Sequence, residues 1–318
     1  MGEFELIRRY FLPLSGRQKS RALILGPGDD CAIQRIPAGR DLVFSVDAFV
    51  EGVHFPRNYR PDYLGWRALA AAASDLAAMG ADPECFTLAL TLPALDEQWL
   101  EDFSRGLRSA SEAFGLELAG GDTTSGPLTL SLQVHGTVEQ GGGIRRSGAR
   151  PGDLIAVSGT LGDAGAALDY LSEPAPSADM LAVLEHYHRP RPKLALGAGV
   201  RQYASAGIDI SDGLLADLGH ILDASGVGAR IESARLPLSP ELVRLKGEKA
   251  LDYALRSGDD YELCLCFPRE NWDRAPASLT SQLTVIGSVE AEQGLYLDGA
   301  DCSSEVLPAG FDHFRSES

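Results

Sequence analysis

The sequence predicts an α/β (α+β) protein built from two domains that each mix helices and strands. Its 318 residues are enough for two domains of roughly 100–200 residues each. Both halves contain segments with the alternating period of half-buried strands and segments with the period of amphipathic helices. Between the halves, residues 139–153 (EQGGGIRRSGARPGD) have the composition of a domain boundary. We therefore expect domains at residues 1–140 and 141–318.

The first half should contain three strands and two helices. Residues 42–50 (LVFSVDAFV) have the composition of a buried strand that runs into a loop. Residues 67–80 are rich in alanine and end in Gly80, which predicts a helix with a glycine at its C-cap. The remaining elements are two alternating strands at 86–92 and 128–134 and an amphipathic helix at 96–115.

The second half repeats this mixture. The expected strands are 154–159, 207–211, 261–267 and 283–289. The expected helices are one that begins near residue 162 and one that spans 212–225. Residues 172–179 and 188–193 are proline-containing and are expected to be loops.

The bulk composition excludes several classes of protein. The formal net charge is -17, which argues against a nucleic acid or a membrane surface as the main partner, because both attract clustered Lys and Arg. The five cysteines form no Cys-x-x-Cys pair, so neither a disulfide framework nor a zinc site is expected. The N-terminus lacks the long apolar run of a signal peptide. A cytoplasmic protein is the expectation.

Carboxylates recur in turns and at strand ends along the chain. They occur in GPGDDC (26–31), GGDTTSG (120–126), TLGDAG (160–165), DISDGL (209–214) and SGDDYE (257–262). Asp47 follows the apolar run LVFSV (42–46), and Asp75 lies inside the alanine-rich helix. Ligands of open α/β domains bind at strand ends, and carboxylate oxygens are the ligands that Mg²⁺ prefers, often together with substrate phosphates. The pattern predicts a site where metal ions hold phosphates.

Each acid also has an ordinary structural explanation. Asp212 could cap a helix N-terminus beside Ser211, and Asp75 could pair with a nearby arginine. Asp122 could be an ordinary turn residue, and the paired acids could be solvated turn residues: Asp29, Asp30, Asp259 and Asp260. Taken together, these separate explanations are less convincing than one shared site, because so many acids fall at turns and strand ends.

Familiar phosphate-binding motifs are missing from the sequence. It contains no Gly-x-x-x-x-Gly-Lys-Ser/Thr loop, no complete Gly-x-Gly-x-x-Gly and no protein-kinase catalytic loop. Arg146, in RRSG (145–148), is a candidate for binding phosphate charge, although it could equally be a solvated residue of an interdomain loop.

Taken together and in order, the motifs resemble one enzyme family. They are GPGDDCA, SVDAFVEGVHF, AASDLAAMGA, GGDTTSG, RRSGARPGD, VSGTLGDAG, IDISDGLLADLGHI and SGDDYELC. The set resembles the thiamine-monophosphate kinases, within the superfamily that includes aminoimidazole ribonucleotide synthetase. The resemblance runs from Asp29 to GFDHF (310–314), and EGVHF with SGDDYEL favours the thiamine enzymes over their relatives.

The resemblance implies an activity and an assembly. Such enzymes transfer the γ-phosphoryl group of ATP to thiamine monophosphate, which is the last step of thiamine diphosphate biosynthesis. They use several Mg²⁺ ions, and a need for K⁺ stays open. Two α/β domains form a cleft, and two chains dimerise through their N-terminal domains.

The resemblance also implies roles for single residues. The implied metal ligands are Asp30, Ser45, Asp47, Asp75, Asp122, Asp209 and Asp212. The implied ATP contacts are Gly121, Asp122, Arg146 and Ser211, and the implied contacts to thiamine monophosphate are His54, Glu262 and Phe311. Cys31 departs from the family's GDDAA pattern, where a small thiol should fit.

The chemistry of this reaction needs no strong general base, because the acceptor is a phosphate oxygen that is already ionised near neutral pH. A carboxylate such as Glu262 and an aromatic wall suit the cationic thiazolium and the aminopyrimidine. Rival interpretations are aminoimidazole ribonucleotide synthetase, selenophosphate synthetase and the hydrogenase-maturation relative. Outside the superfamily, the rivals are a non-catalytic cation- or nucleotide-binding module and a two-metal phosphohydrolase.

Overall fold

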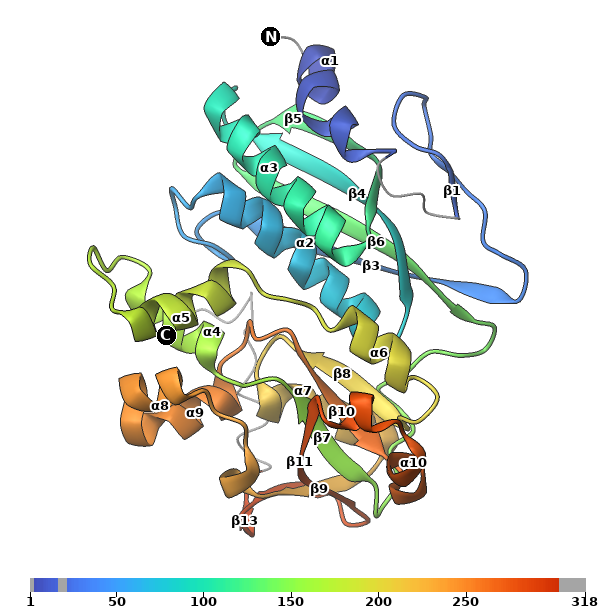
Figure 1. The fold of residues 1–318 in the computed structure, drawn as a ribbon, viewed down its shortest axis with the longest axis vertical. Coiled ribbons are helices and arrows are strands. Elements are labelled where there is room, and N and C mark those ends of the chain that lie inside the picture. Colours follow the sequence, from blue (N-terminus) through green and yellow to red (C-terminus); the bar gives the residue numbers. More distant parts are fainter. Residues whose placement is uncertain (1–2, 17–21, 303–318) are drawn as a thin grey trace. The chain divides into compact units, whose positions relative to one another are not determined.

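The computed structural model describes residues 3–16 and 22–302 of the chain. It divides into two compact units. Unit 1 comprises residues 1–76 and 80–143, and unit 2 comprises residues 77–79 and 144–318. Each unit has its own sheet with helices against it (Figure 1). The predicted mixed α/β class is confirmed.

The sheet of unit 1 has four strands in the order β3-β6-β4-β5. Strand β6 runs antiparallel to β3 and β4, whereas β4 and β5 are parallel. Their bounds are β3 (Arg40–Val50), β4 (Asp82–Leu92), β5 (Glu117–Ser125) and β6 (Thr129–Glu139). Helices α2 (Pro61–Ala78) and α3 (Glu97–Phe114) lie side by side over this sheet (Figure 1).

Small residues and end caps determine how these two helices form and pack. A Cβ added to Gly106 would lie 1.9 Å from the carbonyl oxygen of Asp62, so the backbones of α3 and α2 touch there. Asp96 caps α3 by accepting hydrogen bonds from the N–H groups of Gln98 (2.9 Å) and Trp99 (3.0 Å). Gly80, after α2, has φ 64°, which confirms the predicted glycine C-cap.

Strand β3 forms where it was predicted, but the expectation that it is buried is wrong. Leu42, Phe44 and Val46 are 39%, 61% and 64% exposed. β3 is an edge strand that pairs only with β6 within the described sheet, and one of its faces is open. An apolar composition does not reveal which face a neighbouring element covers, so the sequence could not distinguish a buried strand from an apolar edge strand.

The chain before this sheet contains short elements. They are α1 (Glu3–Leu6), the π-helical turn η1 (Ile7–Phe11), the 3₁₀ turn η2 (Leu12–Leu14) and the two strands of a small antiparallel pair, β1 (Leu23–Leu25) and β2 (Ile33–Gln34). The GPGDDC segment connects β1 to β2 and is mostly exposed.

The sheet of unit 2 has seven strands in the order β13-β12-β9-β11-β7-β10-β8. Every residue of β7, β8 and β10 is buried, as expected for strands that are covered on both faces. The strands are β7 (Leu154–Ser158), β8 (Ala206–Ile210), β9 (Gly228–Ile231), β10 (Glu262–Phe267), β11 (Leu283–Glu290), β12 (Gly294–Leu297) and β13 (Ala300–Asp301).

Short helices connect the strands of unit 2. They are α4 (Asp163–Ala167), α5 (Ala178–His188), α6 (Leu194–Val200), α7 (Leu214–Ser225), α8 (Pro240–Lys246), α9 (Ala250–Arg256), α10 (Arg269–Arg274) and α11 (Ala277–Thr280), with 3₁₀ turns η3 (Leu168–Tyr170), η4 (Ser233–Arg235) and η5 (Gly247–Lys249). Helix α7 packs into the main core, where Leu218 and Ile221 lie with Ile155, Val157 and Ile208 of the sheet.

Strand direction determines where the acids of unit 2 gather. β10 runs antiparallel to both β7 and β8. Its first residue, Glu262, therefore lies beside Ile210 at the end of β8 and next to the end of β7 at Ser158. Three acidic turns that are far apart in the sequence consequently meet at one edge of the sheet.

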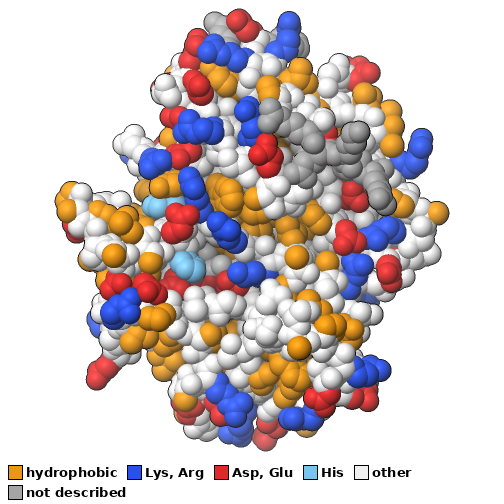
Figure 2. All heavy atoms as spheres, viewed as in Figure 1, with side chains coloured by type: hydrophobic (Ala, Val, Ile, Leu, Met, Phe, Trp, Pro, Cys, Tyr) orange, Lys and Arg blue, Asp and Glu red, His pale blue; other side chains and the backbone are white. Residues whose placement is uncertain are grey.

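The surface carries charge of both signs. On the face drawn in Figure 2, Lys and Arg side chains are scattered among Asp and Glu side chains. In the described residues, no helix is both long and apolar enough to cross a membrane.

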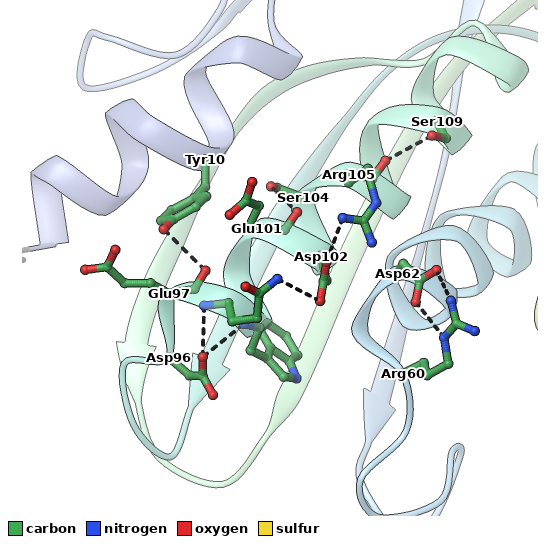
Figure 3. A network of polar contacts seen from close by, with 12 residues as sticks. Tyr10, Arg60, Asp62, Asp96, Glu97, Glu101, Asp102, Ser104, Arg105 and Ser109 are labelled. Atoms are coloured by element: carbon green, nitrogen blue, oxygen red, sulfur yellow. Dashed lines mark hydrogen bonds and ion pairs between the residues drawn. The ribbon is translucent and has the colours of Figure 1, made fainter.

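Polar contacts join the N-terminal helical turn η1 to α3, and local ion pairs lie at the start of α2 and within α3 (Figure 3). The hydroxyl of Tyr10 donates to the carbonyl oxygen of Glu97 at 3.3 Å. Arg105 pairs with Asp102 at 2.6 Å, and Arg60 pairs with Asp62 at 2.8 Å. Because the arginine of each pair is mostly exposed, water screens the attraction, and each pair contributes at most about 1 kcal/mol to stability.

Candidate active site

A first cluster lies in unit 1, where β3 faces α2, and we call it the Asp47 cluster: Ser45, Asp47 and Asp75. Ser45 and Asp47 are two residues apart on β3, so the pleat puts them on the same face. The hydroxyl of Ser45 donates to Oδ2 of Asp75 at 2.5 Å. Burial, and secondly the charge of Asp75, raise the pKa of Asp47 to about 6.

The donor atoms of the Asp47 cluster suit a hard cation. They are two carboxylates and a hydroxyl, all oxygen donors, as Mg²⁺ prefers. Two crowded carboxylates repel each other, and a cation between or beside them would remove that repulsion. Within residues 3–16 and 22–302, no three Asp, Glu, His or Cys side chains come close enough to form a complete metal site. The two carboxylates of the Asp47 cluster therefore do not form a complete metal site by themselves.

Gly121 and Asp122 lie across the same sheet. The pairing register aligns Asp47 with Leu132 of β6, Leu88 of β4 and Gly121 of β5. A Cβ on Gly121 would lie 1.9 Å from the carbonyl oxygen of Leu88, so no side chain fits there. Asp122, the next residue, is exposed.

Two other residues predicted for the site lie in loops of unit 1. Asp30 is exposed in the β1–β2 connection, and its N–H donates to Oδ1 of Asp29 at 3.0 Å. His54 lies in the turn after β3, where its Nδ1 accepts a hydrogen bond from the N–H of Val50 at 3.0 Å. In neutral His54 the proton is therefore on Nε2.

A second cluster occupies the edge of the unit 2 sheet, and we call it the β10 edge: Asp163, Asp209, Asp217, Asp260 and Glu262. Asp209 and Asp217 are both buried. One oxygen of Asp217 accepts three backbone hydrogen bonds, from the N–H groups of Ser211 (3.0 Å), Asp212 (3.0 Å) and Gly213 (3.1 Å). Burial raises the pKa of Asp217 to about 7 despite these hydrogen bonds.

Asp217 therefore shapes the turn that carries Ser211 and Asp212. The residue at the N-cap of α7 is Gly213, which makes no side-chain cap, so the alternative explanation of Asp212 as a helix cap is wrong. The sequence analysis did not select Asp217. Its signal was the one that singled out Asp75: an acid inside an otherwise apolar helix.

Asp260 is not the solvated turn residue that its sequence context allowed. It accepts hydrogen bonds from the N–H groups of Gly162 (2.7 Å) and Ala164 (3.4 Å). Burial raises its pKa well above the usual value, and the charges of Asp163 and Glu262 raise it further. Asp163 is itself buried and accepts from the hydroxyls of Thr160 (2.6 Å) and Ser239 (2.5 Å).

Glu262 is buried and fixed at both oxygens. Oε2 accepts a hydrogen bond from the hydroxyl of Ser158, whose oxygen in turn accepts from the N–H of Leu263 at 2.9 Å. Oε1 lies 2.9 Å from Nζ of Lys193. Ser158 and Lys193 were not predictable as partners of Glu262, because neither residue is near Glu262 along the chain.

Arg146 and Ser211 are both exposed, and each lies on a loop held by neighbouring backbone. The hydroxyl of Ser225, in the last turn of α7, donates to the carbonyl oxygen of Arg146 at 3.2 Å. The hydroxyl oxygen of Ser225 in turn accepts hydrogen bonds from the N–H groups of Gly148 (3.1 Å) and Ala149 (3.2 Å). The carbonyl oxygen of Ser211 accepts from the N–H of Asp259 at 2.9 Å. Phe311 lies outside the described residues.

Comparison with known proteins identifies related chains. Residues 28–138 match the AIR synthase related protein N-terminal domain, and residues 150–299 match the AIR synthase related protein C-terminal domain. A thiamine-monophosphate kinase of Escherichia coli strain K12 is 45% identical over 325 residues, which cover 99% of each chain.

Solved structures agree with this similarity. The crystal structure of a thiamine-monophosphate kinase from Stenotrophomonas maltophilia K279a has a TM-score of 0.85 at 42% identity, over 94% of this chain and 97% of that one. A structure described as AaThiL complexed with AMPPCP and TMP has a TM-score of 0.80 at 34% identity, over 98% of this chain and 97% of that one.

Proposed function

This chain belongs to the thiamine-monophosphate kinase family of AIR synthase related proteins, and we propose that it transfers the γ-phosphoryl group of ATP to thiamine monophosphate. The products are thiamine diphosphate and ADP. The observation that carries the proposal is the similarity over 99% of the chain to a kinase of this name. A related structure that holds AMPPCP and TMP supports the two substrates.

The proposed transfer is direct and needs no general base. The acceptor oxygen of a phosphate monoester is already ionised near neutral pH. The obstacle is repulsion between an anionic monophosphate and an anionic triphosphate, so catalysis comes from positioning and from neutralising charge. The γ-phosphorus–oxygen bond to ADP breaks as the bond to the thiamine phosphate oxygen forms, and no phosphoenzyme is made.

The acids provide the means to neutralise this charge. In unit 1 the proposed Mg²⁺ ligands are Asp30, Ser45, Asp47, Asp75 and Asp122, and in unit 2 they are Asp209 and Asp212. The oxygen donors and crowded charges of the Asp47 cluster support this role. Bound Mg²⁺ would supply positive charge next to the phosphates. Any need for K⁺ stays open.

We expect Mg²⁺ with nucleotide to stabilise the folded protein, because binding to the native state alone shifts the folding equilibrium. Millimolar Mg²⁺ with a non-hydrolysable ATP analogue should raise the melting temperature by at least about 3 °C, measured by differential scanning fluorimetry. Sodium chloride of equal ionic strength serves as the control. An unchanged melting temperature would contradict the metal-binding role.

The substrates would contact residues of both units. The proposed ATP contacts are Gly121, Asp122, Arg146 and Ser211, and the proposed contacts to thiamine monophosphate are His54, Glu262 and Phe311. The exposed position of Asp122, directly after Gly121 on β5, supports a contact to a ligand. The exposed guanidinium of Arg146 supports an anion contact. Residues 1–140 would hold metal and ATP, and residues 141–318 would complete the site.

The proposed assembly is a homodimer formed through unit 1. The exposed apolar side chains of Leu42, Phe44 and Val46 on an edge strand support it, because a row of this kind is a common interface. The proposed location is the cytoplasm, and the five free thiols fit a reducing compartment.

Product identification tests the proposed function. Purified protein is mixed with ATP, Mg²⁺ and thiamine monophosphate, or with free thiamine in a parallel reaction, and the products are analysed by mass spectrometry. We expect thiamine diphosphate and ADP from the monophosphate alone. ATP consumption without thiamine diphosphate would move the acceptor to that of another superfamily member, and no turnover with either would favour a binding module.

A further inference from the structure

The carboxylate of Glu262 is one half of an ion pair at the β10 edge. Its side chain is 8% exposed, and its Oε1 lies 2.9 Å from Nζ of Lys193, whose side chain is 30% exposed. Its other oxygen accepts from Ser158. A Cβ on Gly159 would lie 2.2 Å from Oε1, so the backbone of the β7–α4 turn lies directly against the carboxylate. The carboxylate is thus held from three sides.

Lys193 reaches this carboxylate from a separate stretch of chain. It follows the segment Arg189–Pro192 and stands immediately before α6. Pro190 and Pro192 fix φ at two of the four preceding positions, which limits the paths that this segment can take. The ammonium group is therefore delivered by a connector of restricted conformation.

The pair determines what kind of group Glu262 can recognise. A buried carboxylate that already faces an ammonium group is close to neutral as a unit, so it attracts a second cation weakly. Each carboxylate oxygen nevertheless keeps lone pairs that can accept a further hydrogen bond. Such an acceptor selects for an N–H donor in a fixed direction, not for charge.

We propose that Lys193 is a positioning residue that neutralises and orients Glu262, so that Glu262 accepts a hydrogen bond from the aminopyrimidine of thiamine monophosphate. Glu262 then does not serve as the counterion of the thiazolium ring, which differs from the role that its charge alone suggests. This inference rests on the proposed function, because the substrate role of Glu262 comes from there.

The test compares three acceptors. They are thiamine monophosphate, an analogue in which a neutral thiophene replaces the thiazolium, and an analogue in which an oxo group replaces the pyrimidine amino group. The enzyme variants are wild type, Lys193→Met and Lys193→Arg. Arg191→Met is the matched control, because Arg191 is an exposed cation on the same connector.

With thiamine monophosphate, we expect Lys193→Met to raise KM at least tenfold while kcat stays within threefold, which is the signature of lost binding common to ground state and transition state. Lys193→Arg should restore KM to within threefold of wild type. A further variant, Glu262→Gln, tests the counterion role: the ratio of the thiophene analogue's KM to that of thiamine monophosphate should agree within twofold between wild type and Glu262→Gln. Wild type should use thiamine monophosphate with a higher kcat/KM than the oxo analogue, and this ratio of kcat/KM values should fall at least threefold in Lys193→Met.

Three results would overturn the proposal. One is an unchanged KM in Lys193→Met. Another is a ratio of the thiophene analogue's KM to that of thiamine monophosphate that falls fivefold or more in Glu262→Gln relative to wild type, since the paired Glu262 of the wild type would then be acting as a counterion. The third is equal use of the amino and oxo acceptors by wild type.

A buried carboxylate without its partner can prevent folding. If Lys193→Met does not fold, the double variant Lys193→Met with Glu262→Gln replaces it, because the neutral amide needs no counterion. The double variant should have a raised KM for thiamine monophosphate. The ratio of the thiophene analogue's KM to that of thiamine monophosphate should stay within twofold of the wild-type ratio. A fivefold fall in that ratio would identify Glu262 as a counterion. Wild type that makes no thiamine diphosphate would instead overturn the proposed function itself.

Discussion

Asp47 lies where burial and a neighbouring carboxylate both oppose its negative charge. Such an arrangement is unfavourable for folding and is typical of a functional site. Because the sequence showed an acid directly after an apolar run, its candidacy was predictable, although β3 continues to Val50 and Asp47 lies within the strand and not at its end. Its proximity to Asp75, which accepts a hydrogen bond from Ser45, was not predictable, because it depends on how α2 packs on β3.

We expect Asp47→Asn and Asp75→Asn each to lower kcat by at least about 100-fold, because each removes charge that would hold a cation against the phosphates. Steady-state assays with thiamine monophosphate and circular dichroism measure activity and folding. Glu139→Gln, an exposed acid on the same sheet, is the control. Near-wild-type turnover in both Asn variants would remove Asp47 and Asp75 from the site.

Asp260 shows which kind of residue the sequence leaves undetermined. GDD turns are usually solvated, and nothing near Asp260 in the sequence reveals that Gly162 and Ala164, nearly 100 residues earlier, close over it. The burial of Asp163 was unpredictable for the same reason, because one of its partners, Ser239, is distant in the sequence. The burial of both acids depends on partners that only the fold brings together.

The raised pKa of Asp260 predicts a pH dependence of stability. Because its folded-state pKa lies above its unfolded value near 3.8, its favourable contribution is complete below about pH 4 and is lost as pH rises through the folded-state pKa. Asn cannot ionise, so the Asp260→Asn variant does not lose this stability as the pH rises. In metal-free buffer, the melting temperature of Asp260→Asn relative to wild type should rise by at least about 2 °C between pH 5 and pH 8.

Asp223→Asn, an exposed acid on α7, serves as the control for this comparison and should show no such trend. If the difference in melting temperature between Asp260→Asn and wild type stays constant with pH, ionisation of Asp260 is not the cause of the pH dependence.

At the scale of elements, α7 connects two loops of the proposed site. The turn shaped by Asp217 lies before its first residue, and Ser225 in its last turn holds the Arg146 loop. The helix was predictable from its apolar period and its flanking glycines. That its C-terminal end anchors a loop from the domain boundary was not, because a single serine carries no signal for a partner more than 70 residues away.

Removing the Ser225 hydroxyl should loosen the Arg146 loop without unfolding α7. Ser225→Ala loses three hydrogen bonds, each contributing about 0.5–1.5 kcal/mol, but water can replace part of them at this exposed loop. We expect KM for ATP to rise about 3–10-fold, kcat to stay within threefold and the melting temperature to change by less than about 2 °C. Ser109→Ala, on α3, is the control. An unchanged KM for ATP would show that the hydrogen bonds of Ser225 do not contribute to ATP binding.

At the scale of the whole molecule, a substitution on the apolar face of β3 tests the proposed homodimer. Phe44 is 61% exposed, and an Asp in its place would put a charge into an interface that is otherwise apolar. Phe44→Asp should therefore weaken dimerisation by at least about 100-fold, measured by light scattering after size-exclusion chromatography. Leu181→Asp, on α5 of unit 2 and 55% exposed, is the control. A Phe44→Asp protein that remains dimeric would place the interface elsewhere.

The two-domain α/β class followed from periodicity and from the glycine-rich boundary, because both are local properties of the chain. The order of the seven strands in unit 2 could not be predicted from the sequence, because β9, β12 and β13 are only two to four residues long. Strands of this length carry too few alternations to separate them from loops.

The central position of β7 has a consequence for synthesis on the ribosome. Both of its neighbours, β10 and β11, are translated more than 100 residues after it. At about 5–20 residues per second, the nascent chain carries β7 for about 5–20 s before either neighbour exists. Five consecutive buried residues are then unpaired on both edges and prone to aggregate. The newly made chain therefore depends on rapid completion of translation, or on a chaperone, more than the stability of the finished sheet would suggest.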